Sequence, residues 1–586
     1  MLILSSSTQA QEEIKENGTK QENEQNSSSE GSDTKGVIEA LKSSSKRPPE
    51  VIRVVGSRDA GLELSSEKIL KVPGASNDPI RAVESLPGVV LANGFAPAVR
   101  GSSPDDMYYR SDDVPVGNVF HIDGYSTFHP NLIKSFELKT GAWESEFSDA
   151  NGGVIDTKLR EPDFIKPEVT ADFSFLRAGV LVESQVSEDS AFYFSARQSL
   201  IHLYIENILE DEDFSFQQAP INNDYQFKYL YNLDDNNKVV LQATGSNDEV
   251  ALLFADDSDQ VLQNPELAGG ISSDSFYHNQ GIVWTNFSKY GETKFILNRL
   301  ERSADFTIGQ ILDLDALTVD YLAKIKNVQD FDSGILTSGV DVRTQNINYT
   351  VTGKQQPCNR EFEVCPPSYF APQATEKSEI DIGFITAFAD FNWDITDEVI
   401  LKLGSSINNN DFNQQTFVEP RLAVKWNFVD DFQLKLAYGQ HHQWFRKYQY
   451  LSETFGNPDL NLARSEHYVL GVEYESDSDW AWRLEAYYKD MFDLIVANPE
   501  AQINELDGST DVNETNFLNE GTGKAYGIEF LVNKAISDNW YGWLSIAYSK
   551  TERTNEITDE AFNYQFDLPW IVNLVANYEI NEKWQL

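Results

Sequence analysis

The chain has 586 residues and a formal net charge of −47, with 93 Asp and Glu against 46 Lys and Arg. Nucleic acid is excluded as a partner, because its phosphates would be repelled by so acidic a surface. The length excludes a single small domain. The sequence has no run of about 18 apolar residues, so it predicts no membrane-spanning helix. A transmembrane β-barrel is not excluded, because its strands alternate apolar and polar residues.

The N-terminal residues divide into two segments. Residues 1–10, "MLILSSSTQA", join an apolar stub to small residues and resemble the end of a secretory signal peptide, with a disordered tail as the alternative. Residues 11–49 are rich in Glu, Ser, Asn and Lys and have few large apolar side chains, so we expect a disordered tether.

The two cysteines of the chain are consistent with a secreted protein, as the signal-peptide remnant also suggests. Cys358 and Cys365 lie close together between prolines and suit a small disulfide loop in an oxidising compartment. A metal site is less favoured, because no histidine or second cysteine pair lies nearby in the sequence.

Residues 50–162 have the size and pattern of a compact α/β domain. The apolar run in "EVIRVVGSR" ends at Gly56 and predicts a strand or a strand-forming peptide. The segment "SNDPIRAVESLPGV" places Pro79 early and Pro87 with Gly88 at its end, which predicts a short helix.

Residues 163–586 contain repeated runs of about ten residues with period-two alternation. In "WAWRLEAYYKD" the residues Trp480, Trp482 and Leu484 share one face, and Arg483 and Glu485 share the other. The runs "PRLAVKWNF" and "FITAFADFNWDI" repeat this arrangement. We expect the first face to contact lipid and the second to face water, so that Glu485→Gln should matter little for folding.

A soluble β-sandwich also alternates, but three features favour an outer-membrane barrel. Strand ends carry aromatic residues, charges occupy the inner face, and connections alternate between short and long. The turns "ITDE", "FVDDF" and "SDSD" are short, whereas residues 247–280 and 350–378 are long. We count about seventeen or eighteen strands, and the chain stops inside an apparent strand, "NEKWQL", so we expect a 22-stranded barrel that lacks its last strands.

Several motifs in order resemble the TonB-dependent outer-membrane transporters. They are "VVGSR", "PGASNDPIRAVESLPGV", "VRGSSPDD", "DDVPVGNVFH" and "IKSFELKTGAWESEFSDANGGVID", followed by "PRLAVKW", "GNPDLNLARSEHYVLGVEYE" and "AYGIEFLVNK". The resemblance covers nearly all of the chain after the tether. It implies a large antiparallel transmembrane β-barrel at residues 163–586 with an α/β plug domain, residues 50–162, in its lumen.

The resemblance also assigns the plug motif. Val99, Arg100 and Gly101 would form a segment of the plug sheet, with Arg100 free to pair with carboxylates on the inner wall of the barrel. Residues 112–116, "DDVPV", would form the next hairpin, although the family often has Ile-Asp-Gly where this chain has Ser-Asp-Asp. The assigned plug residues are Arg100, Gly101, Asp112, Asp113, Pro115, Gly152 and Gly153.

Metal and catalytic sites are disfavoured. Asp105, Asp106, Asp112 and Asp113 lack the spacing of an EF-hand loop, and His121 with His129 lacks a helical zinc motif. His441 and His442 are adjacent on a strand, so they point to opposite faces and are interpreted as polar residues of the rim. No nucleophile elbow, Walker loop or dinucleotide motif is present, so we predict neither an enzyme nor a cofactor.

The family mechanism implies active import, in which TonB and its inner-membrane energising complex pull on an N-terminal peptide and shift the plug. Strand addition would capture this peptide, and its best candidate is Glu50, Val51, Ile52, Arg53, Val54 and Val55. The alternative is that this run is the first plug strand. We expect outer-membrane lipid as surroundings and a ferric siderophore, oligosaccharide or peptide as ligand; a barrel that serves as an adhesin or receptor without transport is the runner-up. The acidic loops slightly favour a neutral or cationic ligand.

Overall fold

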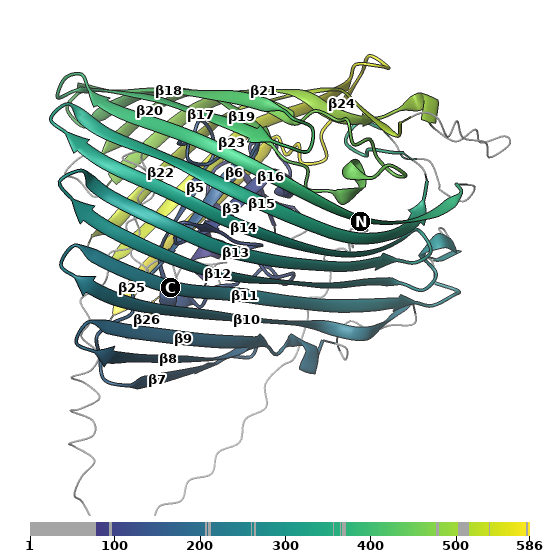
Figure 1. Ribbon diagram of the computed structural model, residues 1–586, viewed down its shortest axis with the longest axis horizontal. Helices are drawn as coiled ribbons and strands as arrows, with labels where there is room; N and C mark the ends of the chain where they lie inside the picture. The colour runs from purple at the N-terminus through teal and green to yellow at the C-terminus, as the bar shows by residue number, and fades with distance from the viewer. Residues whose placement is uncertain are drawn as a thin grey trace, which may run out of the picture. The chain divides into compact units, whose positions relative to one another are not determined.

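The computed structural model in Figure 1 describes most of the chain after residue 77. It describes residues 78–92, 96–205, 208, 213–258, 261–262, 265–355, 357–363, 365, 371–475, 480–501, 515–537, 539–581 and 584–585. All of them belong to one compact unit, Ile52–Leu586. Within these ranges no helix is long and apolar enough to cross a membrane. The predicted signal remnant, tether and TonB-binding peptide lie outside the described residues.

Residues 78–162, called the N-terminal domain below, form two small sheets joined by 3₁₀ turns. A hairpin pairs β1 with β2, and a second sheet has the order β4-β3-β6-β5, with β3 and β6 parallel. The elements are η1 (Ile80–Ser85), β1 (Val89–Ala92), β2 (Ala96–Val99), η2 (Pro104–Asp106), β3 (Met107–Ser111), β4 (Val114–Pro115), η3 (Pro130–Leu132), β5 (Ile133–Lys139) and β6 (Gly153–Leu159).

The predicted helix is present but is a 3₁₀ helix. It begins after Pro79 and ends at Leu86, whose ψ of 152° is extended because the next residue is a proline. All helices in the described part of this domain are 3₁₀ turns, so the domain has less helix than the predicted α/β unit.

The remaining strands form a closed barrel in which chain neighbours pair antiparallel. Its first ten strands are β7 (Glu168–Phe173), β8 (Arg177–Ser187), β9 (Ser190–Ser199), β10 (Phe214–Asp234), β11 (Asn237–Phe254), β12 (Ile271–Ser288), β13 (Gly291–Ile308), β14 (Leu312–Phe331), β15 (Gly334–Lys354) and β16 (Gln373–Asp394). The others are β17 (Val399–Asn410), β18 (Thr416–Val429), β19 (Phe432–Gln443), β20 (Ala463–Glu475), β21 (Trp480–Ala497), β22 (Phe517–Ser537), β23 (Trp540–Asn555), β24 (Glu560–Asn563), β25 (Trp570–Asn581) and β26 (Trp584–Gln585). The barrel connections also contain η4 (Ile201–Leu203), η5 (Pro265–Leu267), η6 (Tyr448–Leu451) and η7 (Pro499–Ala501).

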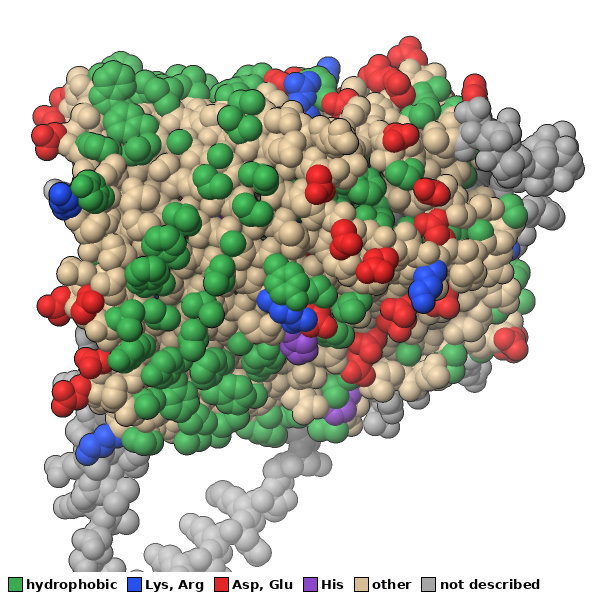
Figure 2. All heavy atoms as spheres, viewed as in Figure 1, with side chains coloured by type: hydrophobic (Ala, Val, Ile, Leu, Met, Phe, Trp, Pro, Cys, Tyr) green, Lys and Arg blue, Asp and Glu red, His purple; other side chains and the backbone are tan. Residues whose placement is uncertain are grey.

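The predicted facing of the strands is confirmed. Leu484 is 44% exposed on the outside of the barrel, whereas Glu485 is 4% exposed. Figure 2 shows apolar side chains gathered over the wall beside the short turns, while acidic side chains gather toward the other rim. This band is the surface expected of a barrel in lipid.

Short turns alternate with longer connections over most of the barrel, although only residues 309–311 join β13 to β14. Residues 395–398 join β16 to β17, and residues 430–431 join β18 to β19. The predicted long loops were too long, because β11 runs to Phe254 and β12 begins at Ile271. Strands of 18 to 22 residues exceed the roughly 9–11 needed to cross a bilayer, so they extend past the apolar band.

The N-terminal domain lies in the lumen. Its side chains, and the Glu84 carbonyl, bond to inward-facing residues on strands from β8 around to β25, and only the lumen of a closed barrel gives access to all of these strands. A buried apolar cluster joins the two parts, with Val83, Phe120 and Ile155 from the domain and Tyr193 and Trp543 from the wall.

Candidate functional site

The turn after β2 brings Arg100 against the barrel wall. Arg100 and Gly101 both have positive φ, +48° and +73°, so they form a turn after the sheet segment rather than part of it. Arg553 on β23 donates a hydrogen bond to the Gly101 carbonyl at 3.1 Å. A Cβ at Gly101 would lie 2.1 Å from Thr551 Oγ1, so only glycine permits both the conformation and this approach.

Arg100 forms a buried ion-pair cluster with two wall carboxylates. Its Nη2 donates to Glu529 Oε2 at 2.6 Å and to Glu485 Oε1 at 2.9 Å, and its Nε donates to Glu529 Oε1 at 3.0 Å. The guanidinium also lies over the ring of Tyr487, 4.6 Å from the centroid. The predicted pairing of Arg100 with carboxylates of the inner wall is therefore present.

Asp112 and Asp113 form the two-residue turn of the β3–β4 hairpin. Both have positive φ, +48° and +71°, as a type I′ turn requires. Asp113 accepts from Lys294 on β13 at 2.7 Å, and Asp112 pairs with Lys228 on β10 at 2.8 Å. Burial would raise the pKa of Asp113, but Lys158 and Lys294 hold that pKa well below its usual range.

Two of the other assigned motif residues, Pro115 and Gly152, contact the wall through their backbones. Asn279 on β12 donates to the Pro115 carbonyl at 2.9 Å, and Lys489 on β21 donates to the Gly152 carbonyl at 3.2 Å. Gly153 begins β6 and pairs with Met107 of β3. These contacts tie the hairpin and the strand β6 to opposite parts of the ring.

His121 makes a second charged anchor. Its Nδ1 lies 2.9 Å from Asp248 and its Nε2 lies 3.2 Å from Asp224, and the side chain is fully buried. Arg197 and Arg177 also contact Asp224. Burial by itself would lower the pKa of His121, but the hydrogen bonds to both carboxylates raise it above its ordinary value.

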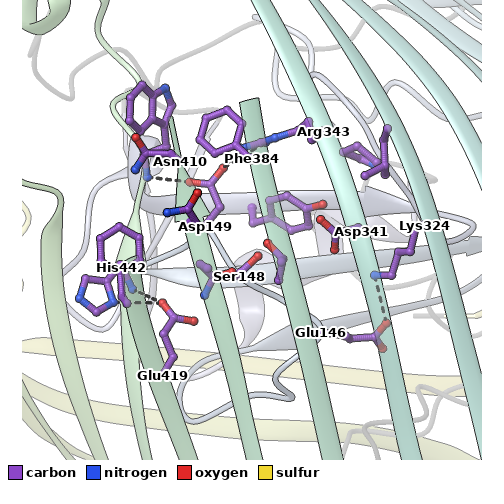
Figure 3. Close-up of a pocket in the computed structure, with 18 of the residues that line it drawn as sticks. Glu146, Ser148, Asp149, Lys324, Asp341, Arg343, Phe384, Asn410, Glu419 and His442 are labelled. Atoms are coloured by element: carbon purple, nitrogen blue, oxygen red, sulfur yellow. Dashed lines mark hydrogen bonds and ion pairs between the residues drawn. The ribbon is translucent and has the colours of Figure 1, made fainter. Parts of the chain in front are cut away.

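A cavity of about 80 Å³ lies between the N-terminal domain and strands β14 to β19 (Figure 3). Asp149 lies at one end of the cavity. Its carboxylate accepts a hydrogen bond from the Trp444 backbone N–H at 2.7 Å and another from Arg343 at 3.3 Å. On the wall, Glu419 accepts from the His442 backbone at 2.7 Å. The other residues that line the cavity are Tyr108, Arg110, Asp113, Pro115, Glu146, Ser148, Leu322, Lys324, Asp341, Phe384, Thr386, Asn408, Asn409, Asn410, Phe417 and Leu462.

The TonB-dependent receptor-like β-barrel family model matches residues 184–586, which is more than half of the chain. The chain belongs to this family. It is an outer-membrane protein of a family of receptors and transporters.

Solved structures of low sequence identity share the fold. The siderophore receptor PirA from Acinetobacter baumannii has a TM-score of 0.64 at 15% identity, over 89% of this chain and 84% of that chain. A mutant ferric enterobactin receptor, PfeA from Pseudomonas aeruginosa, in complex with enterobactin, has a TM-score of 0.62 at 12% identity, over 89% and 91%. The outer membrane transporter YddB from Escherichia coli has a TM-score of 0.63 at 11% identity, over 88% and 83%. The search of curated proteins found no match.

Cys358 and Cys365 of the receptor form a disulfide in the connection between β15 and β16. Within the ring they close, Phe362 is 1% exposed and Asn359 donates to the Ile495 carbonyl at 2.6 Å. Glu361 lies 3.8 Å from Arg553, the residue that also holds the Gly101 carbonyl. The disulfide ring thus packs near the turn that carries Arg100.

The remaining predicted sites have structural explanations. Asp106 caps η2, His129 pairs with Asp172 at 3.2 Å, and His441 packs on Trp143 with centroids 4.0 Å apart. His441 is 1% exposed, so it is buried rather than a residue of the rim. Among the described residues no cluster of three or more ligands could hold a metal ion.

Sequence reasoning missed the wall partners of the N-terminal domain. It left His121 without a role and treated Glu485 as dispensable, yet both are buried in ion pairs. The available signal was a charge on the inward face of a strand, which needs a partner when it is buried. That signal marks Glu485 and Glu529 but does not identify Arg100 as their partner.

Proposed function

We propose that this receptor imports a scarce ligand across the outer membrane by TonB-dependent active transport. The N-terminal domain acts as the plug, which moves when TonB pulls on an N-terminal peptide. We propose no catalytic step and no cofactor, since import requires none.

The observation that carries this proposal is the way the N-terminal domain is held. Charged and polar pairs ring it, in addition to the cluster at Arg100 and the anchor at His121. They include Glu144 with Lys402, Ser145 with Asp390, Glu146 with Lys326, Asp149 with Arg343 and Glu161 with Lys238. Such groups exchange their partners for water when they separate, so the net cost of separation is far below the gross interaction energy.

A domain held by these polar pairs in addition to the apolar cluster described above fits a movable plug. Wall contacts that are mainly apolar would expose a large surface to water on displacement, which costs about 25 cal/mol for each Å². A barrel that serves only as an adhesin needs no domain of this kind in its lumen. The adhesin reading therefore stays the alternative.

Capture by TonB is proposed at residues 50–55. Four of these six residues are Val or Ile, which suits strand addition, in which backbone hydrogen bonds supply most of the affinity. The ligand is proposed to be either an oligosaccharide or peptide, or a ferric siderophore. PirA is a siderophore receptor and PfeA is a ferric enterobactin receptor, and the fold that this chain shares with them supports the second class of ligand.

The test compares source cells that carry the intact receptor with cells in which residues 50–55 are deleted. Deletion of residues 21–26, also six residues, from the tether is the matched control. Competitive growth is measured with iron limiting and with polymeric carbohydrate or peptide limiting. We expect the first deletion to behave like loss of TonB in one of these media and the second to behave like wild type. Equal growth of all strains in every medium would overturn import and favour the adhesin.

A further inference from the structure

The connection between β19 and β20, residues 444–462, packs against the inner wall of the barrel. It shares one buried apolar cluster with β14, β15 and β16, whose members are Trp444, Leu451 and Leu462 from the connection and Ala316, Ile347, Tyr349, Val351 and Ile382 from the strands. A second cluster joins it to the ends of β21 and β22 and consists of Tyr450, Leu460, Ala497 and Phe517. Neither β14 nor β15 nor β16 adjoins β19 or β20, so the connection reaches across the mouth of the barrel to meet them.

The inner face of the wall changes from charged to apolar where the connection covers it. On β15, Asp341 and Arg343 line the cavity beside the N-terminal domain. Ile347 and Val351 lie on the same face of this strand, since alternate residues share a face, and they are 1% and 6% exposed. The lumen of an outer-membrane barrel is polar where water fills it, so apolar side chains at this height need a protein cover. Residues 444–462 supply that cover.

Hydrogen bonds also fasten the connection to the wall. Glu376 on β16 accepts from the Ser452 hydroxyl at 2.7 Å and from the Thr454 backbone N–H at 2.9 Å. Asn457 donates from Nδ2 to the Phe517 carbonyl at the start of β22, at 2.9 Å. The connection is thus held from two separate parts of the ring, at β16 and at β22.

The contacts of the connection with the N-terminal domain are of a different kind. Trp444 donates its backbone N–H to Asp149 at 2.7 Å (Figure 3), and Arg446 Nη2 donates to the Asp149 carbonyl, also at 2.7 Å. Lys447 lies 3.7 Å from Asp105, and these two side chains are 44% and 56% exposed. Among the described residues, neither apolar cluster of the connection includes a member of the N-terminal domain. The connection therefore binds the domain through polar groups, and the wall through apolar groups as well.

Exposing apolar surface to water is costly, whereas polar groups that separate exchange their partners for water. The contacts of the connection with the N-terminal domain are therefore easier to break than its contacts with the wall. We infer that residues 444–462 form a fixed inner shelf, which stays on the barrel wall when the N-terminal domain is displaced. The inference rests on the proposed import function and adds that a passage opens beside the shelf rather than across the whole lumen. Arg446 and Lys447, which lose Asp149 and Asp105 as partners, then face that passage.

The experiment measures backbone hydrogen exchange by mass spectrometry in the purified full-length receptor as urea is raised. Peptides from residues 450–462 report on the shelf. Peptides from residues 143–148 report on the docking of the N-terminal domain, because the Ser145 backbone N–H donates to Asp390 on the wall at 2.9 Å. Peptides from β15 report on the wall itself.

A pair of variants tests the attachment of the shelf to the wall. Glu376→Gln removes the negative charge that accepts from Ser452 and Thr454. Glu379→Gln, on the exposed face of the same strand, is the matched control. The comparison in wild type needs no substitution, so the test stands even if Glu376→Gln does not fold.

We expect residues 450–462 to stay protected at the urea concentration at which residues 143–148 lose protection, and to lose their own together with β15. In Glu376→Gln the shelf should exchange about tenfold faster while residues 143–148 are unchanged, because a hydrogen bond to a charged group is weakened only at the wall. Glu379→Gln should alter neither. Loss of protection at residues 450–462 together with residues 143–148 would overturn the inference, as would equal acceleration of both in Glu376→Gln. The measurement involves neither TonB nor a ligand, so its failure is distinguishable from failure of the growth test for import.

Discussion

Arg100 and Glu529 form a two-point ion pair at the boundary between the N-terminal domain and the barrel. Arg100 Nε and Nη2 donate to the two oxygens of Glu529 at 3.0 and 2.6 Å, and the two side chains are 1% and 3% exposed. Glu485 shares the same guanidinium. Glu485 also lies 3.4 Å from Arg483, so of the two carboxylates it is Glu529 that depends more on Arg100.

Arg100→Gln should weaken the docking of the N-terminal domain. Removing one partner of a buried pair leaves an uncompensated charge and costs about 3–5 kcal/mol. The measurement is the urea concentration at which trypsin begins to cut the N-terminal domain of the purified receptor. Arg299→Gln, which removes the half-exposed pair of Arg299 with Glu301, is the control and should shift the midpoint little. Equal shifts in the two variants would contradict the role given to Arg100.

Gly101→Ala should destabilise the same turn through close contact as well as backbone strain. An alanine at φ +73° costs about 1–2 kcal/mol, and its Cβ would overlap Thr551. Gly269→Ala has a φ of +99° and nothing within 4 Å of the added Cβ, so it isolates the backbone cost. In thermal unfolding Gly101→Ala should lose clearly more stability than Gly269→Ala. Matching losses would show that Gly101 is needed only for its conformation.

The anchor at His121 should weaken as pH rises. Its pKa in the folded protein lies above the ordinary 6.5, so the stabilisation is fully present below that value and is lost as pH rises through the folded pKa. We expect the stability difference between wild type and His121→Gln to shrink from about pH 6 to about pH 9. Urea midpoints across this range measure it, with His278→Gln as a control for replacing a histidine. If the stability difference between wild type and His121→Gln instead grew as pH rose, His121 could not be charged in the folded protein.

Leu484→Arg should destabilise the barrel by about 2–4 kcal/mol, because it places a charge in the middle of the apolar band. Leu484 lies midway between Trp480 and Tyr488 on the outer face of β21. Tyr290→Arg, in a short turn at 61% exposure, is the matched control and should cost about 0–1 kcal/mol. Folding into lipid vesicles measures both, and equal costs would contradict the assigned depth. Glu485→Gln is no longer expected to be neutral, since Glu485 binds Arg100.

The sequence by itself determined the facing of the strands and the alternation of short and long connections. Facing is a local property, because successive side chains of a strand point to opposite faces, so Leu484 and Glu485 could be assigned from their neighbours alone. The hairpin turn at Asp112 and Asp113 was also predictable, since short polar residues tolerate positive φ. The lengths of the loops were less predictable, because strands that continue beyond the membrane are polar on both faces and resemble loops in sequence.

Only the tertiary structure decided which groups meet. Arg100 lies 385 residues from Glu485 and 429 from Glu529, and His121 lies more than 100 residues from both of its carboxylates. The cavity at Trp444 is built from six strands, the connection that follows β19, and the N-terminal domain. No local pattern encodes such pairings, because they depend on how the closed ring places its strands around the domain in its lumen.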